Sequence, residues 1–160
     1  MHYLLLIVPG AEPLVGHWRA GHDGAAAAGI PAHVTVRSPF LPPERWDAAD
    51  LSGTLRHFLP LPVTLARTEN RPGGLVVLAE PDDRLRELTN AASAAWPELP
   101  PHKPRFAQPA YHVTVVRTPE AALRHEARAE LDTQLPLTVE ATELWAVSGT
   151  AEQGFERRVV

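Results

Sequence analysis

The chain has 160 residues, of which 44% are hydrophobic and 21% charged, and its formal net charge is −4. This composition is typical of one soluble globular domain and excludes a disordered chain. The chain has no cysteine, which excludes disulfides, thiolate catalysis and cysteine-ligated metals. The negative charge argues against a dedicated nucleic-acid coat protein, although a short RNA end needs only a local positive pocket.

The first residues predict a strand followed by a helix. His2 to Val8 is a nearly continuous apolar run that ends at Pro9-Gly10, as expected for a buried strand. The run lacks a basic leader and is too short for a signal peptide or a membrane span, so we expect a cytoplasmic protein. From Glu12 to about Ala28 the apolar residues have helical spacing, which is clearest up to Ala20.

The segment His33-Val34-Thr35-Val36 alternates polar and apolar residues, and valine and threonine favour the extended chain. It predicts a strand that ends at Pro39, with its histidine and threonine on one face and its two valines on the other. If this strand stays regular, Arg37 shares the histidine face and is a candidate for binding a substrate phosphate. The alternative is a surface arginine at the end of a strand.

The middle of the chain predicts a helix and a strand pair. A broken helical stripe of apolar residues begins at Pro42-Pro43-Glu44 and continues to His57-Phe58. Leu61–Ala66 and Leu75–Leu78 then predict two paired strands around a loop that contains Pro72-Gly73-Gly74.

A further helix is predicted from Pro81 to Ala95, with acidic residues in its first turn. The proline-rich stretch Pro97–Pro109 excludes a helix or a central strand. We interpret this stretch as a loop that lines the mouth of the site and lends Lys103 or Arg105 to the substrate. A long ordered linker between two lobes is an equally good interpretation.

The first tetrapeptide returns unchanged as His112-Val113-Thr114-Val115, in a strand predicted from Tyr111 to Arg117. In a regular strand, Tyr111 and Arg117 lie on the face opposite His112, so neither is a first candidate for phosphate contact. The composition of the chain yields only about 0.3 chance matches to the pattern His-x-Ser/Thr-hydrophobic, so two identical copies are hard to dismiss.

The chain ends in a predicted helix and two predicted strands. Thr118-Pro119-Glu120 is typical of a helix start, and the helix continues through Leu131. Leu137–Val147 and Gln153–Val160 predict two strands joined near Gly149. Both motif strands are therefore followed by a helix and a strand pair, which indicates an approximate internal duplication, although the first strand of the chain has no clear counterpart.

Two such strands brought together would form a pocket with two imidazoles and two hydroxyls. Histidine titrates near neutral pH, so one ring can take a proton from water while the other gives a proton to a leaving oxygen. The hydroxyls of Thr35 and Thr114 can donate to phosphoryl oxygens. We therefore predict His33, His112, Thr35 and Thr114 as catalytic residues. The alternative is a pair of half-buried edge strands whose histidines face solvent.

The paired motifs, about eighty residues apart in a short chain, resemble those of the 2H phosphoesterase superfamily, which includes bacterial 2′-5′ RNA ligase and cyclic phosphodiesterase proteins. The stretch Pro31–Pro43 and the opening strand followed by a helix also resemble that family. The resemblance implies an α+β fold over residues 1–160, bilobal, with two mostly antiparallel sheets and flanking helices in a pseudo-twofold arrangement around a central cleft. We expect both motif strands to be central in this fold.

The resemblance also implies a metal-independent phosphodiesterase without a cofactor. Its substrates would be 2′,3′-cyclic phosphate ends or 2′-5′ linkages of RNA or small nucleotides, and the reverse ligation would use the same groups. We expect a monomer that does not bind membranes. A non-catalytic protein that captures RNA ends or nucleotides with the same motifs remains an alternative. Turnover of a cyclic phosphate would distinguish the enzyme from such a protein. A histidine-based metal site is the other alternative, but the His-x-Thr pattern offers too few nearby ligands.

Overall fold

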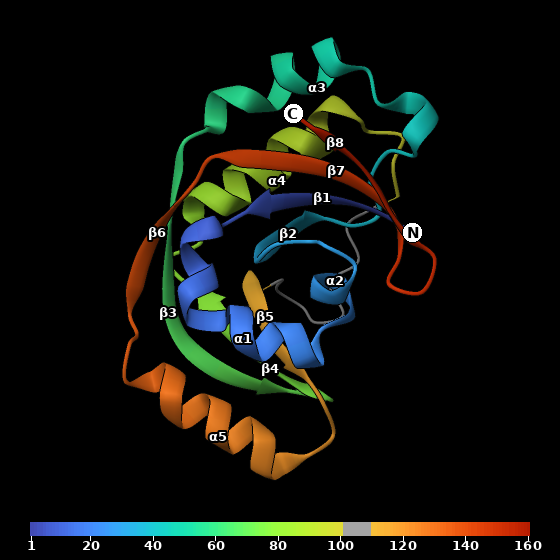
Figure 1. The fold of residues 1–160 in the computed structure, drawn as a ribbon. Helices are drawn as coiled ribbons and strands as arrows, with labels where there is room; N and C mark the ends of the chain where they lie inside the picture. Colours follow the sequence, from blue (N-terminus) through green and yellow to red (C-terminus); the bar gives the residue numbers. More distant parts are fainter. Residues whose placement is uncertain (101–109) are drawn as a thin grey trace.

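The computed structural model describes residues 1–100 and 110–160, so Lys103 and Arg105 lie outside the described residues. The fold is α+β, as predicted. Its strands are β1 His2–Ile7, β2 His33–Arg37, β3 Leu61–Arg71, β4 Gly74–Ala79, β5 His112–Arg117, β6 Leu137–Ala141, β7 Glu143–Thr150 and β8 Gly154–Val159. They form two antiparallel sheets, sheet A in the order β2-β1-β7-β8 and sheet B in the order β5-β4-β3-β6. Sheet B curls around the left side of Figure 1.

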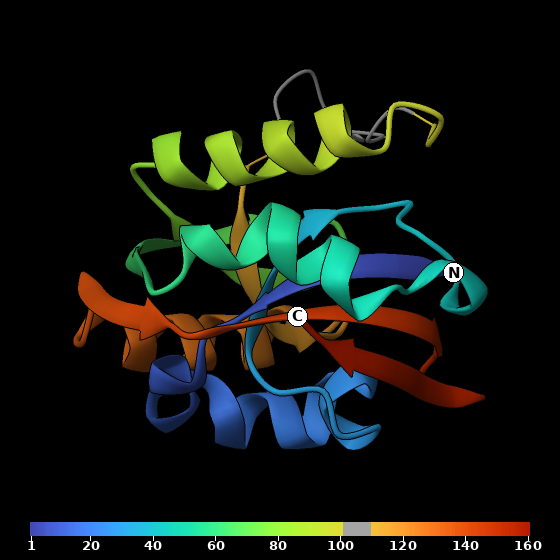
Figure 2. The ribbon, with the colours of Figure 1, turned by 90° about the horizontal axis from the view of Figure 1, so that it is seen from above.

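The helices flank the two sheets. They are α1 Glu12–His22, α2 Gly24–Ala27, α3 Ala48–Leu55, α4 Asp83–Ala95 and α5 Ala121–Asp132, with 3₁₀ turns at Pro9–Ala11, Pro43–Arg45 and Arg56–Phe58. Figure 2 shows α3 and α4 on one side of the strands and α1 on the other. Helix α1 contacts β5 and α4 contacts β2, so each of them packs on a motif strand. None of the helices in the described parts of the chain has the length and apolar character needed to span a membrane.

One hydrophobic core joins these helices to both sheets. The four motif valines, which are Val34, Val36, Val113 and Val115, are fully buried in it, as the alternation predicted. Leu14 and Val15 of α1 and Leu85 and Leu88 of α4 belong to the same core. Burying a side chain of this size contributes about 1.5–3 kcal/mol. The valines therefore anchor both motif strands and leave the histidine face of each strand on the other side.

The two motif strands occupy equivalent places in the fold. Each is antiparallel to the strand that precedes it, and a helix makes the connection: β1-α1-β2 in sheet A and β4-α4-β5 in sheet B. The amide of Val8 donates to Ala32 O and the amide of Ala79 donates to Tyr111 O, each at 2.9 Å and at corresponding positions. The repeated unit is thus a strand, a helix and a motif strand, and the counterpart of β1 is β4.

Two predictions about the strands are wrong. The motif strands are not central in their sheets, because β2 and β5 are edge strands that contact each other. The segment 137–147 is not one strand, because β6 pairs with β3 in sheet B while β7 pairs with β1 in sheet A. The chain changes sheets at Thr142, and Figure 1 shows β6 and β7 leading into different parts of the fold. The hairpin predicted near Gly149 is β7-β8.

The second predicted helix starts later than its apolar stripe indicated. Only a 3₁₀ turn forms at Pro43–Arg45, and the α-helix begins at Ala48. Its N-cap is Asp47, whose carboxylate accepts hydrogen bonds from the amides of Ala49 and Asp50. A capping carboxylate satisfies amides that lack a partner inside the helix, so Asp47 determines where α3 begins.

Candidate active site

Strand β2 contains a β-bulge directly after its threonine. Thr35 pairs with Leu5, but the next pair is Arg37 with Leu4, so Val36 is an extra residue. A bulge changes the face taken by the residues that follow it. Arg37 therefore lies on the core face together with Leu4, and its predicted place on the histidine face is wrong.

Arg37 is only 2% exposed. Its guanidinium donates to Ser93 Oγ on α4, and Nη2 donates to Pro100 O at 3.0 Å. These bonds tie the end of β2 to α4 and to the chain that follows that helix. A regular strand was the condition for its predicted phosphate contact, and that condition is not met.

Strand β5 contains the matching bulge. Here the extra residue is Val115, at the position equivalent to Val36. Val116 consequently takes the core face, and Arg117 returns to the face of His112. The side chain of Arg117 is 69% exposed. The bulge in β2 thus removes Arg37 from the histidine face, and the bulge in β5 adds Arg117 to it. A regular strand would have placed Arg117 on the opposite face.

Both imidazoles are oriented by the same backbone contact. His33 Nδ1 lies 2.8 Å from Pro31 O, and His112 Nδ1 lies 2.8 Å from Ala110 O. A carbonyl oxygen only accepts, so each Nδ1 carries a proton and donates it. In the neutral ring the other nitrogen, Nε2, is a proton acceptor, and in the charged ring it is a proton donor. Each histidine therefore presents Nε2 as its atom for proton transfer.

The two threonines complete the repeated arrangement. Thr35 and Thr114 are half-buried, each on the face of its own histidine and two residues further along the strand. Within the described parts of the chain, neither hydroxyl is hydrogen-bonded to another residue. Both hydroxyls can therefore donate to an oxygen atom of a bound ligand.

Burial lowers the pKa of His33 from its usual value of about 6.5 to about 4. Its bond to Pro31 opposes this change. Among the charged groups around the ring, Arg19 and Arg117 lower the pKa, and Asp23 raises it. The ring of His33 is therefore neutral near pH 7 in the free protein, with Nε2 unprotonated.

The pKa of His112 is lowered for the same main reason, burial of the ring. Its bond to Ala110 opposes the change. The charges of Arg71 and Arg117 lower this pKa further, and Glu69 raises it. The charge of Arg117 acts on both histidines, and the strands that carry them, β2 and β5, are in contact.

An apolar layer accounts for the burial of His33. In the β1–β2 ladder, Ile7 lies directly opposite His33 and Leu5 lies opposite Thr35. Both belong to a second buried cluster, separate from the main core, whose other members are Ile30, Trp145 and Val147. An apolar neighbourhood disfavours the charged ring, which lowers its pKa. This cluster was not predicted, because a continuous apolar run such as His2 to Val8 does not indicate which distant segments cover each face of the strand.

A buried ion cluster, which the sequence analysis also missed, lies before the first motif. Arg19, only 1% exposed, donates to Asp23 Oδ2 from Nε at 3.2 Å and from Nη2 at 3.1 Å. It also donates to Glu12 Oε1 at 3.3 Å and to Ile30 O at 3.1 Å. Glu12 in turn accepts from the amide of Ala32. Pro31 lies between Ile30 and Ala32, and its carbonyl orients the first histidine. The ion cluster therefore holds that carbonyl in place.

A protein-family model described as the 2′-5′ RNA ligase superfamily matches residues 8–152. The matched region contains both motif strands and the ion cluster. The chain belongs to the 2′-5′ RNA ligase superfamily. This is the 2H phosphoesterase superfamily that the paired motifs resembled, and membership supports a phosphoesterase activity on RNA or nucleotide phosphodiesters. A search among curated proteins finds no match.

The lowered pKa of His33 predicts how the stability of this superfamily member depends on pH. The unfolded chain binds a proton at His33 below about pH 6.5, whereas the folded protein does so only near pH 4. The unfolded state is therefore favoured as the pH falls through this window, by up to about 3 kcal/mol for this one group. Above the window His33 contributes no pH dependence.

The variant His33→Asn isolates this contribution, because its amide can still donate to Pro31 O but does not titrate. Relative to wild type, the variant should gain stability as the pH falls from 6.5 to 4. Urea unfolding of both proteins at several pH values measures the difference. A difference that stays constant over this range would contradict the assignment of the lowered pKa to His33.

Proposed function

We propose that the protein is a metal-independent phosphodiesterase that acts on 2′,3′-cyclic phosphate ends or 2′-5′ linkages of RNA or small nucleotides. The observation that carries the proposal is the matched pair of Nδ1–carbonyl hydrogen bonds at His33 and His112. These bonds leave each Nε2 as the atom for proton transfer, and the contact between β2 and β5 supports a shared site for the two rings. Acid–base hydrolysis of a phosphodiester requires two such proton carriers.

In this proposal, His33 and His112 divide the proton transfers. One neutral Nε2 takes a proton from water as the water oxygen bonds to phosphorus. The other Nε2, protonated, gives its proton to the ribose oxygen as the bond between phosphorus and that oxygen breaks. A bound phosphodiester anion raises the pKa of both rings, which supplies the protonated partner near neutral pH. Because the ring of His33 is neutral near pH 7, His33 is our candidate for the base.

The anionic oxygens of the substrate need donors in the same place. Thr35 and Thr114 offer hydroxyls on the histidine faces, and Arg117 offers a guanidinium that acts on both rings. A guanidinium can bind two phosphate oxygens at once. We therefore assign phosphate binding to Arg117 in place of Arg37. Ligation would be the reverse reaction, in which a 5′-hydroxyl takes the place of the water.

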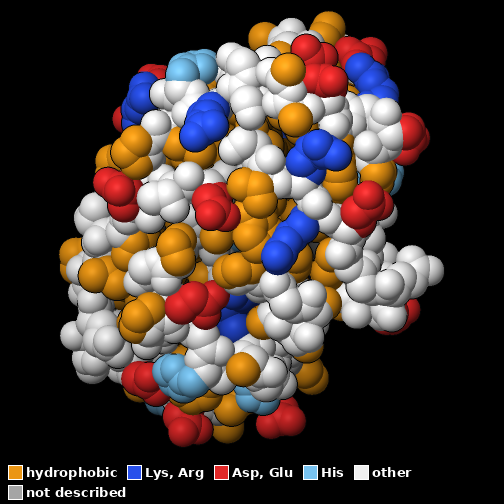
Figure 3. All heavy atoms as spheres, turned by 45° about the horizontal axis from the view of Figure 1, so that its top comes forward, with side chains coloured by type: hydrophobic (Ala, Val, Ile, Leu, Met, Phe, Trp, Pro, Cys, Tyr) orange, Lys and Arg blue, Asp and Glu red, His pale blue; other side chains and the backbone are white. Residues whose placement is uncertain are grey.

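The substrate is proposed to be small or terminal. The net charge is −4, and Figure 3 shows basic and acidic side chains interspersed with apolar ones over the face in view. That face offers no continuous basic surface, which a long nucleic acid would need. A local positive charge beside two histidines suits one phosphodiester group.

The test is an assay of purified protein with nucleoside 2′,3′-cyclic phosphates and 2′-5′ linked dinucleotides, with and without EDTA. We expect hydrolysis at the same rate in both, because histidines carry the protons and Arg117 carries the positive charge. Activity that is lost with EDTA and restored by a divalent cation would contradict the metal-independent mechanism. Binding of these compounds without turnover would favour the capture protein considered above.

A further inference from the structure

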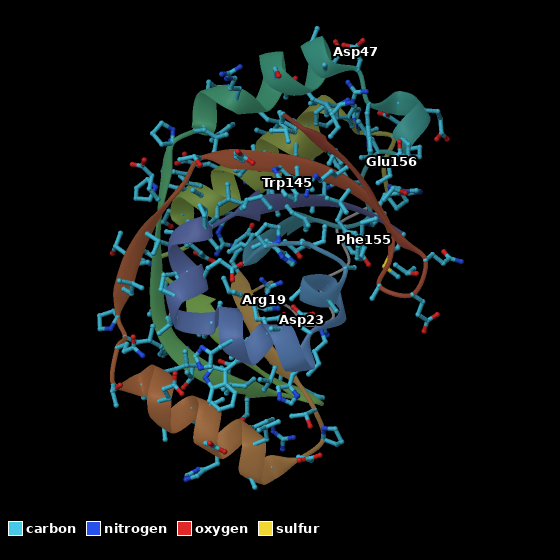
Figure 4. All side chains as sticks on the ribbon, viewed as in Figure 1. Arg19, Asp23, Asp47, Trp145, Phe155 and Glu156 are labelled. Atoms are coloured by element: carbon cyan, nitrogen blue, oxygen red, sulfur yellow. The ribbon has the colours of Figure 1, made fainter. Side chains whose placement is uncertain are left out.

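Asp23 joins the buried ion cluster to the proposed phosphate site. Its Oδ2 accepts two hydrogen bonds from Arg19, and its Oδ1 accepts one from the amide of Ala25 at 3.2 Å. The side chain of Asp23 is 3% exposed. Figure 4 shows Arg19 and Asp23 together at the end of α1. The position of this carboxylate is therefore determined by buried groups and not by solvent.

From this fixed position, Asp23 reaches the other half of the molecule. Its Oδ1 lies 3.6 Å from Arg117 Nε, at the end of β5. In the described parts of the chain, Arg117 has no other hydrogen-bond or ion-pair partner. Because the side chain of Arg117 is largely exposed, this ion pair contributes little to stability. Its consequence is geometric, because the carboxylate occupies the Nε side of the guanidinium and leaves both terminal nitrogens to a ligand.

We infer that Asp23 is a positioning residue for the phosphate site, which holds the Arg117 guanidinium between the two histidine strands. The inference rests on the proposed function, since it gives Arg117 a phosphate to bind. Without the carboxylate, the long exposed side chain of Arg117 would leave the site for solvent in many rotamers. Arg19 pairs with both Asp23 and Glu12, and it therefore fixes the position of the Asp23 carboxylate.

The direction of a pKa change separates this role from a purely structural one. Asp23 raises the pKa of His33, against the lowering by burial and by the charges of Arg19 and Arg117. Asp23→Asn keeps the shape and an acceptor oxygen but removes the charge, so it should lower the pKa of His33 further. Simple loosening of the structure would instead let water reach the ring and raise this pKa towards its usual value.

The experiment compares wild type, Asp23→Asn, Arg117→Gln and the double variant. NMR titration of the His33 ring should show a lower pKa in Asp23→Asn and a higher one in Arg117→Gln. Arg117→Gln should raise this pKa less in the Asp23→Asn background, because Arg117 is then no longer held near the ring. The kcat/KM for a nucleoside 2′,3′-cyclic phosphate should fall about ten-fold or more in each single variant, since misplacing a binding group is costly. In the Arg117→Gln background, Asp23→Asn should have little further effect, because its target is gone.

Asp132→Asn is the matched control, since Asp132 also pairs with an arginine, Arg128, and accepts a hydrogen bond, from Thr68, but lies on α5. A His33 pKa that rises equally on Arg117→Gln in the wild-type and Asp23→Asn backgrounds overturns the inference, as does a full further loss of kcat/KM in the Arg117→Gln background. The titration needs no turnover. Wild type that hydrolyses no phosphodiester but shows the pKa changes would contradict the proposed function and leave the placement of Arg117 by Asp23 supported.

If Asp23→Asn does not fold, the Arg117 variants still test the inference. Arg117→Lys keeps the positive charge as a compact ammonium but has no Nε–H for the carboxylate to hold. Lysine should therefore restore the lowered His33 pKa only in part and leave kcat/KM close to that of Arg117→Gln. Full activity in Arg117→Lys would show that orientation by Asp23 is unnecessary and would overturn the inference.

Discussion

Replacing His33 or His112 by alanine is expected to lower kcat by roughly 10²–10⁴, which is the usual contribution of a positioned proton-transfer group. The double variant should be little worse than either single variant, because an acid and a base act as a unit. Steady-state kinetics with a nucleoside 2′,3′-cyclic phosphate measures these losses. The wild-type profile of kcat/KM against pH should be bell-shaped, and each single variant should lose one limb of it.

The control for these variants is His125→Ala, since His125 is an exposed residue on α5. It should keep wild-type turnover. The second check is His33→Asn, which can keep the bond to Pro31 O but has no titrating Nε2, and which should be as inactive as the alanine variant. Near-normal turnover in both motif-histidine variants, together with a clear loss of thermal stability, would mean that the repeated tetrapeptide is structural.

The second large effect is expected at Arg19, whose loss should reduce the free energy of unfolding by about 3–5 kcal/mol. Arg19→Met keeps much of the side-chain volume but removes the cation beside a nearly fully buried carboxylate, that of Asp23. An unpaired buried charge is far more costly than a missing surface pair. Chemical denaturation monitored by circular dichroism measures the difference.

The fold offers a closely matched control. Arg86 and Asp82 form another ion pair four residues apart, at 2.6 Å, but their side chains are 45% and 28% exposed. Arg86→Met should change the free energy of unfolding by no more than about 0.5 kcal/mol, as is usual for exposed pairs. Equal effects of the two substitutions would show that burial does not make the Arg19 pair special.

Much of the fold was determined by local sequence. Strict alternation in the two tetrapeptides predicted both motif strands and the burial of their valines, because side chains alternate along a strand whatever it pairs with. The apolar stripes predicted α4 to within two residues, since a helix forms from its own hydrogen bonds. They also predicted the start of α1, but the predicted helix to about Ala28 is divided at Asp23 into α1 and α2. The repeated His-x-Thr pattern was also sufficient to predict the superfamily, which the match to the family model confirms.

What local sequence could not determine were features set by a partner strand. The bulges at Val36 and Val115 arise in the pairing with β1 and β4, and they decide that Arg37 is buried while Arg117 joins the histidines. The edge positions of β2 and β5 and the change of sheet at Thr142 likewise depend on which strands pair.

The ion cluster before the first motif could not be predicted from the sequence for a similar reason. Its residues lie on α1 and in the chain that follows it, and none belongs to a recognisable pattern. Only the docking of α1 buries Arg19 against Asp23, and only the packing of α1 against β5 brings Asp23 to Arg117. Alternation along one chain therefore predicted which side chains share a face, whereas contacts between distant segments decided which of them share a site.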